Sequence, residues 1–174
     1  MTTRRIGAED LAAVSALAAA SKGDYNTYPI ERFEEELSGR SERAPAAERA
    51  AFGSFDGATL VAVGCATPEG DGWGYISRVY VHPEYRSRGV ARALVAHLEE
   101  YLASHGCHTA YLRFWGGWVN LQRYWIRRGY AREGTEGTSW AAPKGLVAGY
   151  VVQASKQLKE GAPAKRPRSA AGRR

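Results

Sequence analysis

Hydrophobic positions recur every four residues over a long segment in the middle of the chain. The repeat consists of Val90, Leu94, Leu98 and Leu102, widened by Ala91, Val95 and Tyr101. This spacing is typical of a helix with one buried face. Just before it, residues 75–81 alternate and carry the β-branched and aromatic residues of a strand, which His82-Pro83 ends because proline cannot continue a ladder. The pattern predicts a strand, a short turn and a helix that begins near Gly89.

The N-terminal third has the pattern of one strand and two helices. Residues 3–6 form a short strand, and a helix with one apolar face follows from about Glu9 to Ser21. Residues 22–28 have loop composition, and Pro29 occupies the favoured first position of a second helix. That helix directs Ile30, Phe33 and Leu37 inward. We expect residues 38–48 to be a linker or a mobile continuation of this helix.

The remaining pattern consists mainly of strands. Residues 51–55 and 59–66 flank Asp56-Gly57, which is a strong hairpin signal, and residues 68–72 turn the chain into the strand at 75–81. A strand at 109–114, a helix around 121–128 closed by Gly129-Tyr130, and a last strand at 146–153 follow. We place Trp140 in a glycine-rich turn region. The order βααβββαβαββ predicts an α/β protein with a mixed, twisted sheet and helices on both faces.

Composition and length predict one domain over residues 1–156. With 174 residues, 44% of them hydrophobic, the chain has enough apolar surface for a full core. No apolar run reaches the roughly 20 residues that span a bilayer, and no signal-peptide core follows Met1, so we expect a cytoplasmic protein with no membrane contact. Cys65 and Cys107 lack metal-ligand spacing, so they are interpreted as reduced packing residues, and no metal site is expected. Both a monomer and a homodimer fit this composition.

The net charge of +6 lies entirely in the C-terminal tail. Residues 156–174 hold seven basic residues and one acidic residue, while the 17 basic and 17 acidic residues before them cancel. The tail is rich in Gly, Pro, Ala and Ser, so we expect residues 157–174 to be disordered. A solvated tail is the simpler interpretation, and an arm that binds nucleic acid is the alternative.

The turn before the central helix has the residues of an anion site. The first amides of a helix have no intrahelical acceptors and lie at the positive end of the helix dipole, so phosphate oxygens bind there. Gly89 and the small Ala91 allow a ligand to approach the backbone, and Arg86 and Arg88 add positive charge.

This turn resembles the signature of the GNAT superfamily of acyl-CoA-dependent N-acyltransferases. The family pattern Gln/Arg-x-x-Gly-x-Gly/Ala stands here as Arg86-Ser87-Arg88-Gly89-Val90-Ala91, after the family's usual Val-x-Pro strand end. The resemblance implies the same order of elements over residues 1 to about 156. It also implies acetyl-CoA as co-substrate, bound in a cleft where strands 75–81 and 109–114 splay apart.

The resemblance places the donor along the first of these strands and at the helix start. The pyrophosphate would bind the amides from Arg88 to Ala91, and the strand would pair its backbone groups with the pantetheine amides. An asparagine of the family stands here as Asn120, two residues late. The expected donor site comprises Val79, Tyr80, Val81, Arg86, Ser87, Arg88, Gly89, Val90, Ala91 and Asn120.

The expected proton-transfer groups depart from the family pattern. The family often has a tyrosine four residues before a Gly-Phe pair, where it protonates the departing thiolate; here that position is Trp125, whose indole is no acid. Tyr124 is the neighbouring candidate acid, although adjacent helical residues point about 100° apart. His82 has a suitable intrinsic pKa for a base but also fits a strand-end cap. Further candidate bases, beside a water relay, are Tyr28, Glu34, Glu35 and Asp71.

The acceptor side is predicted to be aromatic. Candidate acceptor-binding residues in the loops are Tyr25, Tyr28, Trp73, Trp115 and Trp118, with Trp140 nearby. Aromatic faces suit a planar or cationic small molecule, although some of these rings will fill the core. We therefore expect acetyl transfer to a primary amine of a small molecule. The alternatives are a macromolecular acceptor, such as a protein N-terminus or an aminoacyl-tRNA reached through the basic tail, and a non-catalytic acyl-CoA-binding module.

Overall fold

A computed structural model describes residues 1–21, 30, 33–34, 49–142 and 145–158, and for residues 138–142 and 145–150 it describes the backbone alone. The helices are α1 (Leu11–Ala20), α3 (Val90–Ser104) and α4 (Val119–Arg127). The strands are β1 (Thr2–Arg5), β2 (Ala50–Asp56), β3 (Thr59–Pro68), β4 (Trp73–Val81), β5 (Thr109–Trp115), β6 (Ala131–Ala142) and β7 (Gly145–Gln157). The expected loop 22–28, the linker 38–48 and the tail from Lys159 lie outside the described residues.

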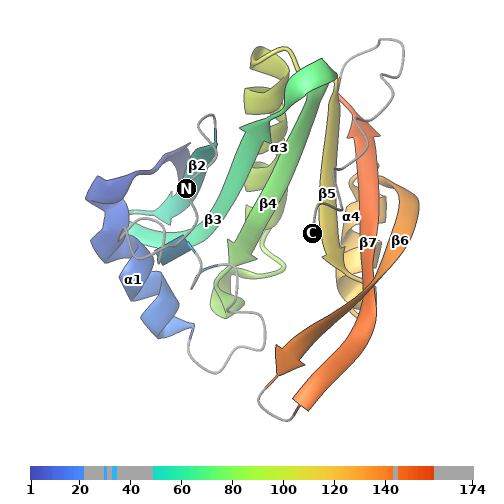
Figure 1. Cartoon of the computed structure of the whole chain (residues 1–174). Coiled ribbons are helices and arrows are strands. Elements are labelled where there is room, and N and C mark those ends of the chain that lie inside the picture. The colour runs from blue at the N-terminus through green and yellow to red at the C-terminus, as the bar shows by residue number, and fades with distance from the viewer. Residues whose placement is uncertain (22–29, 31–32, 35–48, 143–144, 159–174) are drawn as a thin grey trace.

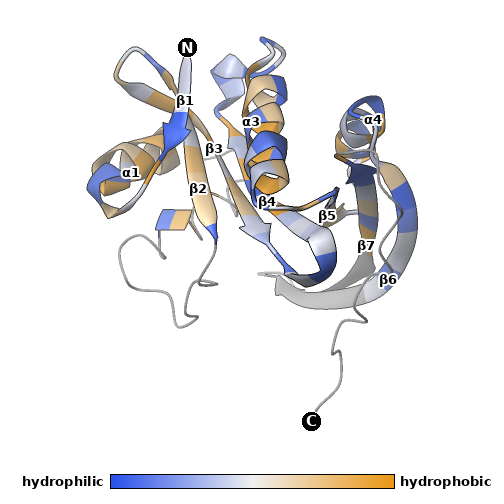
Figure 2. Cartoon of the chain, turned by 90° about the horizontal axis from the view of Figure 1, so that it is seen from above, coloured by the Kyte–Doolittle hydropathy of each residue, from blue (hydrophilic) through white to orange (hydrophobic). Residues whose placement is uncertain are grey.

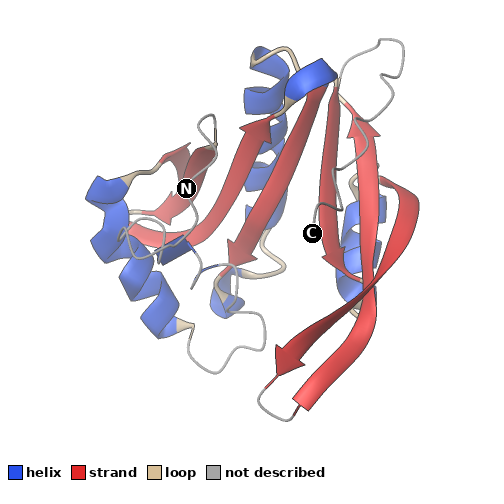
Figure 3. Cartoon of the chain, viewed as in Figure 1, coloured by secondary structure: helices blue, strands red, loops and turns tan. Residues whose placement is uncertain are grey.

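Within the described residues, the strands form one twisted, seven-stranded mixed sheet in the order β1-β2-β3-β4-β5-β7-β6 (Figures 1 and 3). All neighbouring strands run antiparallel except β4 and β5, which are parallel. Parallel neighbours need a crossover, and α3 supplies it. The α/β class and the mixed sheet predicted from the sequence are therefore confirmed.

The last strand is longer than the sequence pattern predicts, and the strand before it occupies the predicted turn region. Trp140 lies inside β6, opposite Val147 of β7, and not in a turn. Glycine weakens a strand because it has no side chain to pack, but the β6–β7 ladder needs only backbone groups and runs over eleven aligned pairs. The helix expected around 121–128 also begins earlier, at Val119.

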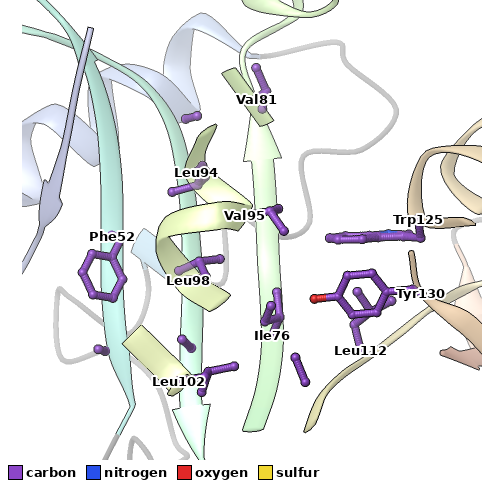
Figure 4. Packing of buried hydrophobic residues seen from close by; sticks show 14 of the residues in the cluster. Phe52, Ile76, Val81, Leu94, Val95, Leu98, Leu102, Leu112, Trp125 and Tyr130 are labelled. Atoms are coloured by element: carbon purple, nitrogen blue, oxygen red, sulfur yellow. The ribbon is translucent and has the colours of Figure 1, made fainter. Parts of the chain in front are cut away.

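Helices cover both faces of the sheet. One core cluster joins α3 and α4 to one face, through residues such as Leu98, Ile76 and Trp125 (Figure 4). A second cluster joins α1 to the opposite face, and it contains Val14 and Tyr80 as well as Ile30 and Phe33 of the expected second helix. Figure 2 shows β2 and β3 between α1 and α3. The strands β2, β3 and β4 thus contribute side chains to both cores, because the side chains of a strand point to both faces of a sheet.

Both cysteines are buried and neither is part of a disulfide, as expected for reduced packing residues. The Cys107 thiol donates a hydrogen bond to the Trp73 carbonyl at 3.3 Å. None of the described helices is long and apolar enough to cross a membrane.

A mostly buried charge cluster fastens α3 to α4 and β7. The Glu99 carboxylate of α3 accepts hydrogen bonds from Lys156 Nζ at 2.8 Å, Arg128 at 3.2 Å and the Tyr130 hydroxyl at 3.0 Å. The side chains of Glu99, Arg128 and Lys156 are 12%, 16% and 25% exposed. Removing one member of such a cluster leaves the other charges poorly solvated and unpaired.

We expect Glu99→Ala to lower the free energy of unfolding by about 2–3 kcal/mol, because it leaves two cations without their shared partner. Denaturant unfolding measures this change. Glu100→Ala is the matched control: it removes a carboxylate from the next position of α3, where the side chain is 78% exposed. The control should change stability by less than about 0.5 kcal/mol. Equal effects from both substitutions would show that the cluster does not stabilise the fold.

Candidate active site

The parallel strands β4 and β5 stay paired over only three residues. Trp73 is opposite Thr109, Gly74 opposite Ala110 and Tyr75 opposite Tyr111, and no further pair follows. Strand β5 continues instead along β7 as far as Trp115 (Figure 1). Beyond Tyr75, the edge of β4 that faces β5 is therefore open, and an extended ligand could add to it as a strand would.

A β-bulge bends β4 within this open segment. The register with β3 skips between Cys65–Ser77 and Val63–Tyr80, and Arg78 has a positive φ of 55°. Few non-glycine residues adopt such an angle. Arg78 is not among the residues expected from the sequence. The local signal for the bulge is the spacing of Ile76 and Val79, which are three residues apart yet both contact the α3 core. Bulges of this kind re-aim backbone groups next to functional sites.

The turn after β4 has the conformation that an anion site needs. Ser87 and Gly89 both have positive φ, 60° and 83°, and Gly89 is the N-cap residue of α3. A Cβ atom at Gly89 would meet nothing within 4 Å, so the backbone there is open to solvent. Val90 is buried in the core and Ala91 packs against it, which anchors the first turn of α3. The first amides of α3 thus lie at an accessible helix N-terminus.

The polar side chains around this turn make different contacts. Arg86 donates from Nε to the Val81 carbonyl at 3.0 Å, so it ties the turn to the end of β4. Arg88 is exposed, with its guanidinium 5.4 Å from the centre of the Tyr85 ring. The His82 ring accepts a hydrogen bond from the Glu84 amide at 3.4 Å, which is the capping role considered above.

Helix α4 places an aromatic cluster against the same core. Trp125 is buried, and the Tyr124 hydroxyl is buried with no hydrogen-bond partner among the described residues. Burial raises the pKa of Tyr124 above its usual value. Asn120 is exposed at the start of α4. A phenol without a partner can donate to a ligand, but none of its described neighbours accepts its proton.

Of the expected acceptor-binding residues, the structure describes three. Trp73 is buried in the paired part of β4, where its ring meets Tyr111 edge-on at 6.0 Å. Trp115 and Trp118 are half-buried at the end of β5 and the start of α4. Tyr25, Tyr28 and the base candidate Glu35 lie outside the described residues. Of the other base candidates, Glu34 accepts a hydrogen bond from Ser15 at 2.7 Å, and Asp71 is exposed.

A polar hollow of about 380 Å³ lies over β5, β7 and β6. It is lined by Arg113, residues 133–136, Val151 and Gln153. Leu112 and Ala154 point into the α3/α4 core, so the alternate residues Arg113 and Gln153 face the opposite side of the sheet. Arg113 pairs with Glu136, and Glu133 accepts a hydrogen bond from Gln153 at 2.9 Å. The sequence analysis missed these residues because the hollow forms only when three strands pair.

Comparison with protein-family models matches residues 12–130 to the acetyltransferase (GNAT) family. The chain belongs to this family. No curated protein matches the chain. Among solved structures, the ribosomal-protein-S18-alanine N-acetyltransferase of Escherichia coli is similar, at a TM-score of 0.71 and 14% identity over 92% of this chain and 96% of that one.

Two further solved structures have the same GNAT fold. The ribosomal-protein-alanine N-acetyltransferase of Brucella melitensis has a TM-score of 0.67 and 18% identity, covering 90% of this chain and 99% of its own. An aminoglycoside 6'-N-acetyltransferase complexed with coenzyme A has a TM-score of 0.65 and 17% identity, covering 94% and 100%. At these identities the likeness concerns the fold alone.

Acetyl-CoA, which the GNAT family uses, carries both a chain of amides and a pyrophosphate, so its chemistry fits an open strand edge next to a helix N-terminus. Strand β4 can pair with the amides, and the start of α3 can bind the phosphates. No cluster of His, Cys, Asp and Glu that could hold a metal occurs among the described residues.

Gly89→Glu should weaken CoA binding at least tenfold, about 1.4 kcal/mol, because it places a carboxylate where phosphate would bind. Calorimetry of CoA binding measures this. Gly106→Glu is a closely matched control: Gly106 follows the other end of α3, has a φ of 82°, and also has open space around a Cβ atom. Backbone strain is then equal in both variants, so equal CoA affinities would remove the anion site from the start of α3.

Tyr124→Phe should leave turnover within a few-fold of the parent, because its hydroxyl is buried without a described partner. Stability should stay level or rise, since an unsatisfied buried hydroxyl is removed. Tyr130→Phe is the control, and it should cost about 1.5–3 kcal/mol through the lost hydrogen bond to Glu99. A fall of about 10²–10⁴ in the single-turnover rate of Tyr124→Phe would instead identify Tyr124 as the general acid.

Proposed function

We propose that the protein transfers the acetyl group of acetyl-CoA to a primary amine of a small molecule. The observation that carries this proposal is the open edge of β4 beyond Tyr75, which leads directly to the N-terminus of α3. The donor's amides would pair with residues 76–81, and its pyrophosphate would bind the amides from Arg88 to Ala91. Arg88 would add positive charge to this site.

The reaction needs few protein groups. The lone pair of a neutral amine attacks the thioester carbonyl carbon, the C–N bond forms, and the C–S bond breaks as CoA thiolate leaves. The nitrogen loses one proton, and the thiolate or solvent takes one up, which balances the products amide and CoA. A strand amide can donate a hydrogen bond to the tetrahedral oxyanion. Positioning of the amine in the β4–β5 opening supplies the remaining rate through effective concentration.

The polar hollow is the proposed approach route of the acceptor. The α3/α4 face of the opening is filled by buried side chains such as Trp125, whereas Arg113, Glu133 and Glu136 are exposed on the other face. The hollow's volume of about 380 Å³ suits a small molecule. One guanidinium and two carboxylates give it a net charge of −1, which favours an acceptor with an ammonium group over an anionic one.

A mass-spectrometric screen of primary amines with acetyl-CoA tests the proposal. We expect acetylation of at least one small cationic amine, and we expect deletion of residues 159–174 to leave that turnover within about twofold. The deletion begins at Lys159 because Lys156 binds Glu99 and the Leu158 amide donates to the His108 carbonyl at 2.8 Å.

The deleted segment carries six basic residues and one acidic residue, so it holds most of the net charge. Acetylation of a protein N-terminus or an aminoacyl-tRNA by the full chain, lost on deletion, would favour the macromolecular acceptor. CoA binding without turnover of any amine would favour a non-catalytic module.

A further inference from the structure

Trp125 presents a buried indole to the open segment of β4. Trp125 is 4% exposed. In Figure 4 its ring extends from α4 toward β4, at a level between the labelled Val95 and Ile76. Ile76 is the first residue of β4 beyond the last pair with β5, Tyr75 with Tyr111. The indole therefore lies beside the part of β4 that β5 leaves unpaired.

The surrounding contacts hold this indole in place. It meets the Tyr124 ring edge-on at 5.0 Å and the Tyr130 ring edge-on at 5.2 Å. The Trp125 carbonyl also accepts a hydrogen bond from the Tyr130 amide at 3.1 Å. Tyr130 in turn donates its hydroxyl to Glu99, which binds Arg128 of the same turn region. Because Tyr130 is fixed from both ends, the indole packed against it has little room to retreat.

Burial and the neighbouring Glu99 raise the pKa of Tyr130 well above its usual value. Its phenol therefore stays protonated and donates to Glu99. A close-packed core of this kind resists added volume, because extra methylenes force side chains off their preferred rotamers.

The direction of the donor brings its acyl end to this indole. With its phosphates at the start of α3, the pantetheine arm of the proposed donor would run along β4 from Val81 toward Tyr75, which would bring the thioester toward the level of Ile76. We propose that Trp125 limits the acyl group of the donor to acetyl, by filling the space that a longer acyl chain would need. This inference rests on the proposed use of an acyl-CoA donor, and it concerns which donor is accepted.

Calorimetry with stable thioethers tests acyl selection without turnover. The parent should bind S-ethyl-CoA at least tenfold more tightly than S-butyl-CoA, about 1.4 kcal/mol. Trp125→Leu should bring the two affinities within about threefold of each other while free CoA binds as in the parent. Turnover of butyryl-CoA relative to acetyl-CoA should rise in the same variant. Trp125→Phe removes less volume, so its preference for S-ethyl-CoA should lie between those of the parent and of Trp125→Leu. If the leucine variant does not fold, the phenylalanine variant provides the test.

Phe55→Leu is the control for loss of a buried aromatic ring. Phe55 is 7% exposed and belongs to the α1 cluster on the other face of the sheet. This variant should keep the parental preference for the ethyl thioether. Equal binding of both thioethers by the parent, or an unchanged preference in a folded Trp125 variant, overturns the inference. Failure of the parent to bind free CoA overturns the proposed function itself, and it is a separate outcome of the same titration.

Discussion

The short parallel pairing of β4 and β5 is the constraint on which the candidate site depends. Three residue pairs join the strands, after which β5 follows β7 while the bulge at Arg78 bends β4. Unpaired backbone groups in a sheet are costly unless water or a ligand satisfies them. In the part of the chain that the structure describes, β4 and β5 separate beyond Tyr75, and the proposed donor would pair its row of amides with the edge of β4 that faces this opening.

The rest of the site follows from the end of the same strand. A chain leaving β4 must reverse direction to form the crossover helix, and the left-handed residues Ser87 and Gly89 make this reversal. The N-terminus of α3 therefore meets the open strand edge as a consequence of topology. One ligand that carries both amides and phosphates fits both features, so the proposed donor site is built mainly from backbone groups.

The two faces of the β4–β5 opening carry different kinds of side chains. On the α3/α4 face, Trp125 and Tyr130 pack closely, and Glu99 joins three elements around them. On the other face, Arg113 and Glu136 are exposed over β5 and β6. A packed wall and a polar hollow thus lie on opposite sides of the same strands. Under the proposed roles, acyl selection and acceptor binding would depend on separate sets of residues.

The sequence by itself determined the local elements, which depend only on residues close together in the chain. The helix from Val90, the strand ending at Val81, the Asp56-Gly57 hairpin and the turn at Gly89 were all predicted, because periodicity and turn chemistry act within a few residues. Only the tertiary structure decided the extent of the β4–β5 pairing, the bulge at Arg78, the strand around Trp140 and the hollow beside Arg113. These features arise from pairing between segments far apart in the chain. Local sequence patterns do not specify which strand will pair with a given strand edge. The buried state of Trp125 and Tyr124 has the same origin, since their surroundings come from α3, β4 and the turn at Tyr130.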